Sequence, residues 1–236
     1  MPRLPNPALL TRIVDVATMA FIRGGYRNTR IEDVAGQADV AVGTVYRYVE
    51  NKAALFELVL RRAFHDPGAL EPALPYRATD LAGQVEQIWR LLSASASFET
   101  LRAAAELVDE PQDVGREVEA IVRETYGWLF GHWRGLKLIE RCARDWPELA
   151  ALFYRQFRAE LLALGTRYVQ RRTAQGLIRH MPDAAVAARL MVETCAFFAM
   201  HRHTAPDSTM DDAVAEETVV RMLRNAFVEQ PAGRSA

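Results

Sequence analysis

The spacing of apolar residues has the period of an α-helix along almost the whole chain. Between residues 7 and 23 apolar side chains recur every three or four positions, and Gly24 and Gly25 follow directly. Glycine after such a run is typical of a helix C-terminal cap, because glycine readily adopts the left-handed backbone that ends many helices. The pattern predicts a first helix over residues 7–23, and no stretch of the sequence has the two-residue alternation of a β-strand.

The segment that begins at Thr29 predicts a short second helix. Thr29 and Glu32 stand three residues apart. This is the spacing of a capping box, in which each of the two side chains bonds a backbone N–H group at the start of the helix. One apolar face of the helix is formed by residues at spacings of three and four, Ile31, Val34 and Ala35.

A tight turn and a third helix are predicted next. Asp39 breaks the apolar pattern and is one of the few non-glycine residues that tolerate a left-handed turn. Val45 and Val49 then lie one helical turn apart, which predicts a short helix over about 41–49 with both valines facing inward. Asn51 is a good N-cap for the helix that follows.

The outward side of the predicted third helix combines small, hydroxylated, aromatic and cationic residues. Small residues let a helix enter a DNA major groove deeply. Hydroxyl and guanidinium groups bond base edges or phosphates, and an apolar residue can contact a thymine methyl group. A three-helix packing unit with a few exposed tyrosines is the alternative interpretation of the same pattern. The residues concerned are Val42, Gly43, Thr44, Tyr46, Arg47 and Tyr48.

These residues fall in register with a known family. The chain resembles the N-terminal DNA-binding domain of the TetR/AcrR family of transcriptional regulators over roughly residues 9–60, about a quarter of its length. The matching residues are the pair Gly25-Tyr26, Thr29, the run Gly43-Thr44-Val45-Tyr46-Arg47-Tyr48, and the run Lys52-Ala53-Ala54-Leu55.

Four positions depart from the family pattern. Arg30 stands where a second threonine is common, Asp39 replaces a turn glycine, Ala41 replaces a serine cap, and Val49 replaces a phenylalanine. The first three alter phosphate contacts or the turn, and Val49 leaves the core slightly less filled. None of them removes the recognition helix.

The resemblance implies that the chain binds double-stranded DNA. Base readout is expected from Thr44, Arg47 and Val42, since hydroxyl, guanidinium and small apolar groups contact base edges. Phosphate contacts are expected from other residues of the same surface. The remaining members of the expected DNA-binding set are Thr29, Arg30, Gly43, Tyr46, Tyr48 and Lys52.

A segment rich in proline, residues 66–79, separates this region from the rest of the chain. We therefore predict a DNA-binding domain over 1–65, a linker over 66–79, and a larger helical effector-binding and dimerisation domain over 80–236. The fold class is all-α. Further helices are predicted to start at Asp80, Ser97, Asp113, Trp146, Asp183 and Asp211.

Two C-terminal helices, 184–200 and 212–228, carry more apolar surface than the core of one monomer needs. We expect them to form a homodimer interface of four helices, as the resemblance also implies, because a palindromic operator requires two-fold symmetry. An ordinary buried core is the alternative. The candidate interface residues are Ala188, Met191, Cys195, Phe198, Val219 and Met222.

Aromatic residues gather on the helices between the linker and the last two helices. The resemblance implies a small-molecule pocket in this region, although core packing explains most individual aromatic residues equally well. The expected effector is apolar or amphipathic. The candidate pocket residues are Trp89, Phe98, Trp128, His132, Trp133, Phe153 and Tyr154.

Composition and charge narrow the class of protein. The chain has 236 residues, 50% of them hydrophobic, and a formal net charge of −1, which argues against a generally basic nucleic-acid coat protein. Residues 1–65 carry a balance of +3 and the remainder −4, as expected if DNA binding is confined to one end.

The cysteines and the lack of a recognisable targeting signal predict a cytoplasmic protein. Cys142 and Cys195 have no metal-ligand spacing and are expected to be buried free thiols in a reducing compartment. No metal site or cofactor is indicated. The N-terminus lacks the apolar core of a signal peptide, and no stretch reaches the roughly 18 uncharged apolar residues of a membrane span.

The sequence therefore predicts a DNA-binding transcriptional regulator, a dimeric repressor that an effector releases from a palindromic operator. The alternatives are a ligand-independent regulator or activator of the same family, or a helical protein–protein adaptor without DNA binding. An enzyme is not indicated, because no catalytic triad spacing, paired metal ligands or phosphate-binding loop is present.

Overall fold

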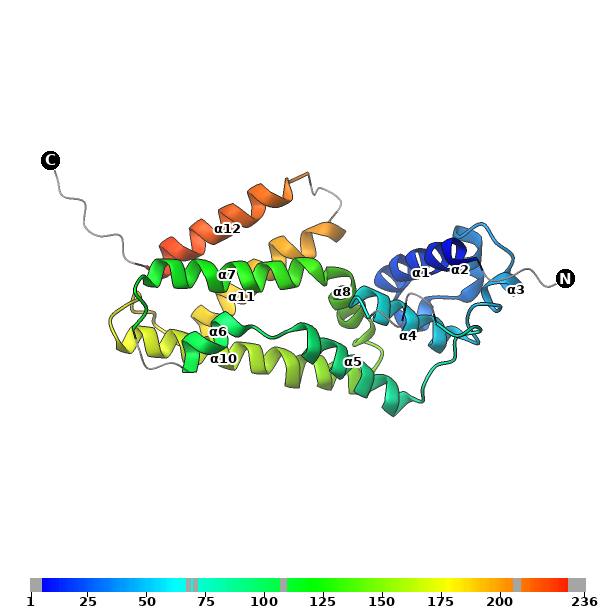
Figure 1. The fold of residues 1–236 in the computed structure, drawn as a ribbon, viewed down its shortest axis with the longest axis horizontal. Coiled ribbons are helices and arrows are strands. Elements are labelled where there is room, and N and C mark those ends of the chain that lie inside the picture. Colours follow the sequence, from blue (N-terminus) through cyan, green and yellow to red (C-terminus); the bar gives the residue numbers. More distant parts are fainter. Residues whose placement is uncertain (1–5, 67–68, 70–71, 107–109, 206–208, 229–236) are drawn as a thin grey trace. The chain divides into compact units, whose positions relative to one another are not determined.

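The computed structural model describes residues 6–66, 69, 72–106, 110–205 and 209–228, except the side chain of Leu81. The chain forms two compact units (Figure 1). The first unit contains Met1–Ser95 and Arg134–Phe157, and the second contains Ala96–Trp133 and Arg158–Ala236. In the described part of the chain, helices are joined only by turns and loops. One isolated β-bridge, Val49 with Tyr76, is the sole extended pairing there, so the predicted all-α class is confirmed.

The first unit begins with four helices in the predicted order. They are α1 (Pro7–Asn28), α2 (Ile31–Gln37), α3 (Val42–Val45) and α4 (Lys52–Ala63). α1 packs against α2 and α4, and α2 packs against α3. Burial of the predicted apolar faces removes side chains such as Ile13, Val34, Val45, Val49 and Leu55 from water entirely, which is the main favourable contribution to folding.

The first helix continues past the predicted end at Arg23. Gly25 has φ +78° and ψ 173°, so the helix is interrupted there and a further turn follows to Asn28. A side chain at Gly25 would also meet Arg141 and Asp145 at 3.0 Å. The guanidinium of Arg141 donates to the carbonyl oxygen of Gly24 at 2.9 Å. Gly25 thus interrupts the helix near the predicted cap, but the helix ends at Thr29, and a segment more than a hundred residues further along binds the carbonyl group of Gly24.

Among the described residues, four more helical segments belong to the first unit. They are α5 (Leu81–Ser95), α8 (Trp133–Cys142), α9 (Pro147–Ala150) and the π-helix η2 (Ala151–Phe157). α5 packs against α4 and η2. Trp146 lies in an aromatic cluster with Tyr26 and Phe56. The compact units therefore group the chain differently from the predicted domains 1–65 and 80–236, because α5 and residues 134–157 belong with the N-terminal helices.

Gly135 provides a test of packing inside the first unit. A Cβ atom at Gly135 would lie 2.5 Å from the ring of Phe64, which is buried at the end of α4. Overpacking of this kind exceeds the gain in helix propensity, so Gly135→Ala is expected to lower the free energy of unfolding by about 1–3 kcal/mol. Chemical denaturation measures the change.

Gly127 is the matched control, because it is an exposed helical glycine with no atom within 4 Å of the position that a Cβ atom would take there. Gly127→Ala is expected to stabilise the protein by about 0.5–1 kcal/mol. In a Phe64→Leu background the penalty at Gly135 should fall. An equal, favourable effect of both alanines in the wild-type chain would contradict the predicted clash.

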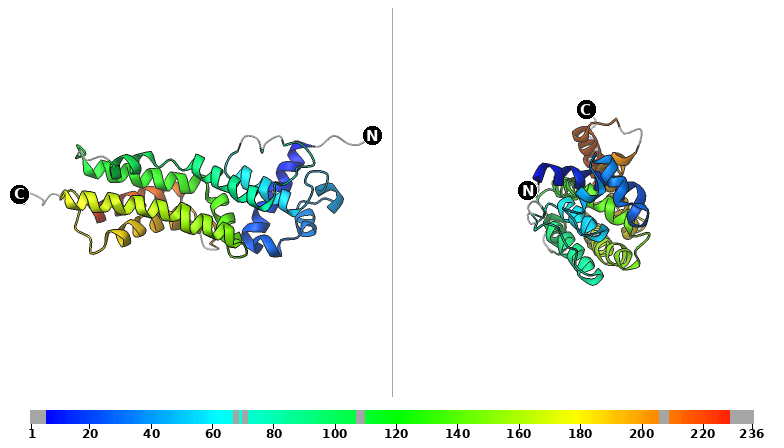
Figure 2. Two further views of the ribbon diagram at one scale, coloured as in Figure 1. Left: turned by 90° about the horizontal axis from the view of Figure 1, so that it is seen from below. Right: turned by 90° about the vertical axis from the view of Figure 1, so that its right-hand side faces the viewer.

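The described residues of the second unit form a bundle of five α-helices and one short 3₁₀ segment. Its elements are α6 (Glu99–Glu106), α7 (Val114–Gly131), α10 (Arg158–Ala174), α11 (Ala184–Ala199), η3 (His201–Thr204) and α12 (Asp212–Phe227). α7 packs against α6, α11 and α12, and α10 packs against α6 and α11 (Figures 1 and 2). The side chains of Asp113, Asp183 and Asp211 accept bonds from the backbone N–H three residues on, so these three predicted N-caps are confirmed.

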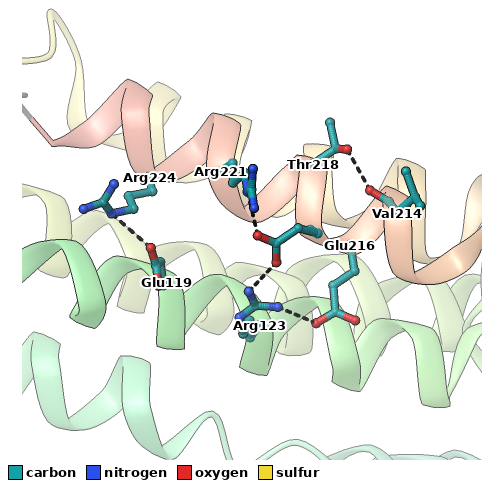
Figure 3. Close-up of polar contacts among 8 residues, drawn as sticks. Glu119, Arg123, Val214, Glu216, Thr218, Arg221 and Arg224 are labelled. Carbon is teal, nitrogen blue, oxygen red and sulfur yellow. Dashed lines mark hydrogen bonds and ion pairs between the residues drawn. The ribbon is translucent and has the colours of Figure 1, made fainter.

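Charged groups fix the register between α7 and its neighbours. Arg172 of α10 is buried and donates twice to Glu117 of α7, at 2.9 and 2.7 Å. Arg123 of α7 pairs with Glu216 and Glu217 of α12 at 3.3 and 2.6 Å on the surface (Figure 3). Removing either partner of the buried pair would leave an uncompensated buried charge, whereas the exposed pairs are individually weak.

One described segment, Ala184–Thr204, is long and apolar enough to cross a membrane by length and composition alone. The core helix of a soluble protein passes the same test. This segment includes α11, whose buried side packs on α7, α10 and α12. Packing in the core of the second unit therefore explains the apolar residues on the buried side of α11.

Candidate nucleic-acid interface

A Schellman turn sets the angle between α2 and α3. Asp39 has φ 51°, in the left-handed region that the sequence predicted for it. The backbone N–H of Asp39 donates to Gly36 O at 3.1 Å, and that of Val40 donates to Ala35 O at 3.0 Å. These two bonds are the hydrogen-bond pattern of a helix that ends in a left-handed residue. The helix–turn–helix is therefore closed locally, and an aspartate takes the place usually held by glycine.

The capping box predicted for α2 is wrong. Arg30, not Thr29, occupies the N-cap position, and no side-chain bond caps the helix. The hydroxyl group of Thr29 is buried and donates to Gly25 O at 2.8 Å. Its backbone N–H also donates to Gly25 O. Thr29 therefore satisfies the carbonyl groups at the end of α1, and neither of its donors faces outward.

The outward side of α3 presents the side chains expected to read bases. Gly43 and Arg47 are exposed, while Val42 and Thr44 are half-buried. A guanidinium N–H of Arg47 donates to Thr44 Oγ1 at 3.2 Å. No atom lies within 4 Å of the position that a Cβ would take at Gly43. The first turn of α3 is thus small and open, with a cationic fork oriented by a neighbouring hydroxyl group.

The two tyrosines after this turn lie in different environments. Tyr46 is 45% exposed and shares the surface with Arg47. Tyr48 is buried, contrary to its expected outward position, and its hydroxyl accepts from the backbone N–H of Asn6 at 2.9 Å. The side chain of Asn6 caps α1 by accepting from Ala8 N at 3.0 Å. Tyr48 therefore anchors the end of α3 to the start of α1.

The side chain of Lys52 is also directed into the unit. Its ammonium group donates to Arg27 O at 3.3 Å and Thr29 O at 3.2 Å, and it lies 4.7 Å from the ring centroid of Tyr26. The neighbouring Asn51 accepts from Ala54 N at 2.9 Å, which confirms the predicted cap of α4. Lys52 thus joins α4 to the end of α1, where helix carbonyl groups attract a cation.

The structure brings together only part of the expected DNA-binding set. One surface contains Val42, Gly43, Thr44, Tyr46 and Arg47. The other expected residues either turn inward or lie beside this surface. Arg30 is exposed beside the start of α2. The side-chain contacts given above direct Thr29, Tyr48 and Lys52 into the first unit. Assignment of the whole set to DNA stays a prediction.

The candidate pocket residues divide between the two units. Within the second unit, Trp128 packs edge-on against Phe98 at 5.2 Å and stacks on His132 at 5.2 Å, and Trp133 stacks on His203 at 5.0 Å. Within the first unit, Phe153 packs against Tyr154 at 5.1 Å. The remaining candidate, Trp89 of α5, also belongs to the first unit. A pocket formed by these seven residues stays a prediction.

An open hollow of about 420 Å³ lies in the first unit between the end of α4 and α5. It contains none of the seven candidate residues. Its lining includes an imidazole, a carboxyl and a guanidinium group beside apolar side chains, namely Phe64, His65, Asp66, Gln87, Arg90 and Leu91. Periodicity alone could not have indicated this hollow, because the lining residues come from two helices separated by the linker.

The candidate dimer residues lie mostly inside the second unit. Ala188, Met191, Cys195 and Val219 are buried there, and Met222 is 67% exposed. Burial raises the pKa of the Cys195 thiol to about 12. Burial likewise raises the pKa of the Cys142 thiol to about 12, so both are the buried free thiols that the sequence predicted.

The other side of α11 and α12 is apolar and exposed. We call these exposed residues the apolar stripe, and they follow helical spacing along each of the two helices. They are Val186, Leu190 and Phe197 of α11, with Val214 and Met222 of α12, each more than half exposed. Helical periodicity showed that both helices are apolar on more than one side, but it could not show which side the monomer core covers.

Known proteins share both the local motif and the fold. The profile of the family described as "Bacterial regulatory proteins, tetR family" matches residues 13–59. The HTH-type transcriptional repressor KstR of Mycolicibacterium smegmatis is 31% identical over 120 residues, which cover 47% of this chain and 59% of KstR. The chain thus spans less than two thirds of the length of the curated relatives it matches.

Solved structures match over nearly the full chain at low identity. A regulatory protein of the tetR family from Rhodococcus RHA1 has a TM-score of 0.52 at 14% identity, covering 94% of this chain and 98% of that one. AibR, in complex with isovaleryl coenzyme A and operator DNA, has a TM-score of 0.50 at 15% identity, covering 91% and 97%. At this identity the likeness supports the fold alone.

The first unit contains a helix–turn–helix whose second helix, α3, presents its outward side to solvent. This arrangement defines the helix–turn–helix class of DNA-binding proteins. The order of its helices, the matching family profile and the similar folds specify the class further. Residues 13–59 match the model of the tetR family of bacterial regulatory proteins, and the fold of the chain is similar to that of solved members.

Proposed function

We propose that this protein is a dimeric transcriptional repressor that binds a palindromic operator and is released from it by a small molecule. The observation that carries the proposal is the outward side of α3 and of the turn after it, where Gly43 and Arg47 are exposed, Thr44 is half-buried, and Arg47 donates to Thr44 Oγ1. An arginine fork and a hydroxyl on the outward side of a recognition helix and its following turn suit base readout in the major groove. The name of the relative KstR, a transcriptional repressor, supports the same role.

The apolar stripe supports a two-fold dimer. Single exposed apolar residues are ordinary, but five large ones aligned on two adjacent helices are typical of an interaction surface. A second copy of the chain would cover the stripe with the same residues, as an isologous contact requires. Two recognition helices then read half-sites about one DNA turn apart, roughly 34–36 Å or an adjusted multiple.

Control by a ligand is the third part of the proposal. AibR was solved with both isovaleryl coenzyme A and operator DNA, which supports a ligand-responsive regulator without naming this protein's effector. A ligand changes DNA affinity only through its different affinities for the DNA-competent and DNA-incompetent states. The protein is proposed to act in the cytoplasm by binding, without catalysing a reaction.

Selection of bound sequences from a random DNA pool tests the proposal. The expected result is one enriched palindrome, whose affinity for the protein falls steeply as salt rises, because phosphate contacts release counterions. A scrambled sequence of the same length is the control. Enrichment of no sequence, or equal binding to the scrambled duplex at every salt concentration, would instead favour a helical protein–protein adaptor.

A further inference from the structure

The segment that joins α4 to α5 is hydrogen-bonded to the residues that follow α3, the proposed recognition helix. We call residues 72–80 of this segment the strap. The backbone N–H of Tyr76 donates to Tyr48 O at 2.8 Å, and the N–H of Glu50 donates to Tyr76 O at 2.9 Å. Together they form a parallel bridge between Val49 and Tyr76. The strap is therefore bonded to the residues that directly follow α3.

The side chain of Tyr76 connects this bridge to α4. Its hydroxyl donates to Glu57 Oε1 at 2.6 Å and accepts from Arg61 Nη1 at 3.0 Å. The ring is 9% exposed. Burial first, and then the bond to Glu57, raise the pKa of Tyr76 to about 12, so the hydroxyl keeps its proton in neutral solution and remains a donor.

The buried carboxyl group of Glu57 accepts hydrogen bonds from both the strap and α5. Glu57 is 4% exposed, and its second oxygen accepts from the backbone N–H of Thr79 at 2.9 Å and from the Thr79 hydroxyl at 3.0 Å. With its amide nitrogen oriented toward α4, Gln87 of α5 also donates to Glu57 at 3.0 Å. Each donor offsets the cost of burying the carboxyl group, so the network favours one arrangement of α4, strap and α5.

The turn at Asp39 and packing against α2 fix the N-terminal end of α3, and the contacts after Val45 fix its C-terminal end. α3 has four residues, of which only Val45 is buried, and it continues as tightened turns through Val49. Its C-terminal end is anchored by Tyr48 at the start of α1 and by the strap. A helix this short presents its outward side at an angle that depends on its anchors, and a small misplacement of base-reading groups costs affinity.

We propose that Tyr76 is a positioning residue of the DNA-binding surface, through which the buried Glu57 fixes the backbone at Tyr48–Glu50 and hence the angle of the recognition helix. This inference rests on the proposed function. It adds that α4 and α5 act on α3 through the strap, so a movement of α5 relative to α4 reaches the recognition helix through Glu57 and Tyr76.

The test removes one hydroxyl group. Tyr76→Phe keeps the ring but leaves Glu57 without one of its donors, and we expect affinity for the selected operator to fall about tenfold. Amide hydrogen exchange at Glu50, whose N–H donates to Tyr76, is expected to speed up by a similar factor. The salt dependence of binding should stay unchanged, because no phosphate contact is lost.

Two further variants separate positioning from general stability. Tyr26→Phe removes a hydroxyl from another partly buried tyrosine of the same unit and should leave both readouts within about twofold. Thr79→Val removes a donor to Glu57 without touching the bridge to Tyr48, and should weaken operator binding in the same direction by about threefold. If the Tyr76→Phe variant does not fold, the Thr79→Val variant still tests the proposal.

The outcomes distinguish this inference from the proposed function. If Tyr76→Phe speeds up amide exchange at Glu50 but leaves operator affinity unchanged, Tyr76 has only a structural role. If neither exchange nor affinity changes, the strap does not position α3. Both results overturn the inference while DNA binding stands. A wild-type protein that binds no duplex would overturn the proposed function and the inference with it, while the exchange rates would still report whether Glu57 holds the strap.

Discussion

Replacing Arg47 with alanine is expected to weaken operator binding by about 1–3 kcal/mol and to relax the preference at one base pair. Arg47 is exposed in the turn that follows α3, and its bond to Thr44 Oγ1 at 3.2 Å orients the guanidinium before DNA arrives. A pre-oriented fork loses less side-chain entropy on binding than a free arginine. The bidentate contact it can make to a guanine is lost entirely in the alanine variant.

Gel-shift titrations against the selected operator, and against duplexes changed at each position in turn, measure both effects. The variant should bind the operator more weakly yet discriminate less at one position in each half-site, while the other positions keep their preferences. Arg155→Ala is the matched control, because Arg155 is an exposed arginine of the same unit away from α3 on η2. Wild-type affinity for the Arg47→Ala variant, with all base preferences intact, would remove Arg47 from the readout surface.

Local sequence signals predicted local structure well. The caps formed by Asn51, Asp113, Asp183 and Asp211 involve a side chain and a backbone group three residues away, and such pairs can be recognised from spacing alone. The left-handed turn at Asp39 has the same character, since its bonds close within six residues. These features fixed the order and approximate bounds of the helices.

Contacts between distant residues could not be predicted in the same way. Thr29 has the spacing of a cap for α2, but its hydroxyl serves the preceding helix, and no spacing rule distinguishes the two roles. Tyr48 finds its partner Asn6 42 residues earlier. Tyr76 reaches α3 from a segment that the sequence indicated only as a linker. Each of these residues turns inward because of a partner that periodicity does not reveal.

Leu190→Glu is the change expected to have the largest effect on the assembly. Leu190 is 61% exposed on α11, in the middle of the apolar stripe. In a two-fold interface the introduced carboxylate would lie near the symmetry-related stripe, where burying an unpaired charge is costly. The proposed dimer is expected to dissociate into monomers, as measured by analytical ultracentrifugation across a range of protein concentrations.

Loss of the dimer should carry through to DNA binding. Two linked heads gain roughly 10²–10⁴ in avidity over one head, so the monomeric variant should bind the full palindrome little better than a single half-site. The fold of each chain should survive, because Leu190 lies on the exposed side of α11 while α12 stays fixed to α7 by Arg123 with Glu216 and Glu217 (Figure 3).

Ala163→Glu is the matched control for this prediction. Ala163 is an exposed residue of α10, another helix of the second unit, and the substitution adds the same charge on a helical surface. It should leave both the mass in solution and the affinity for the palindrome unchanged. A Leu190→Glu protein that remains a dimer and binds the palindrome like wild type would place the contact between copies elsewhere, and the stripe on α11 and α12 would then need another partner.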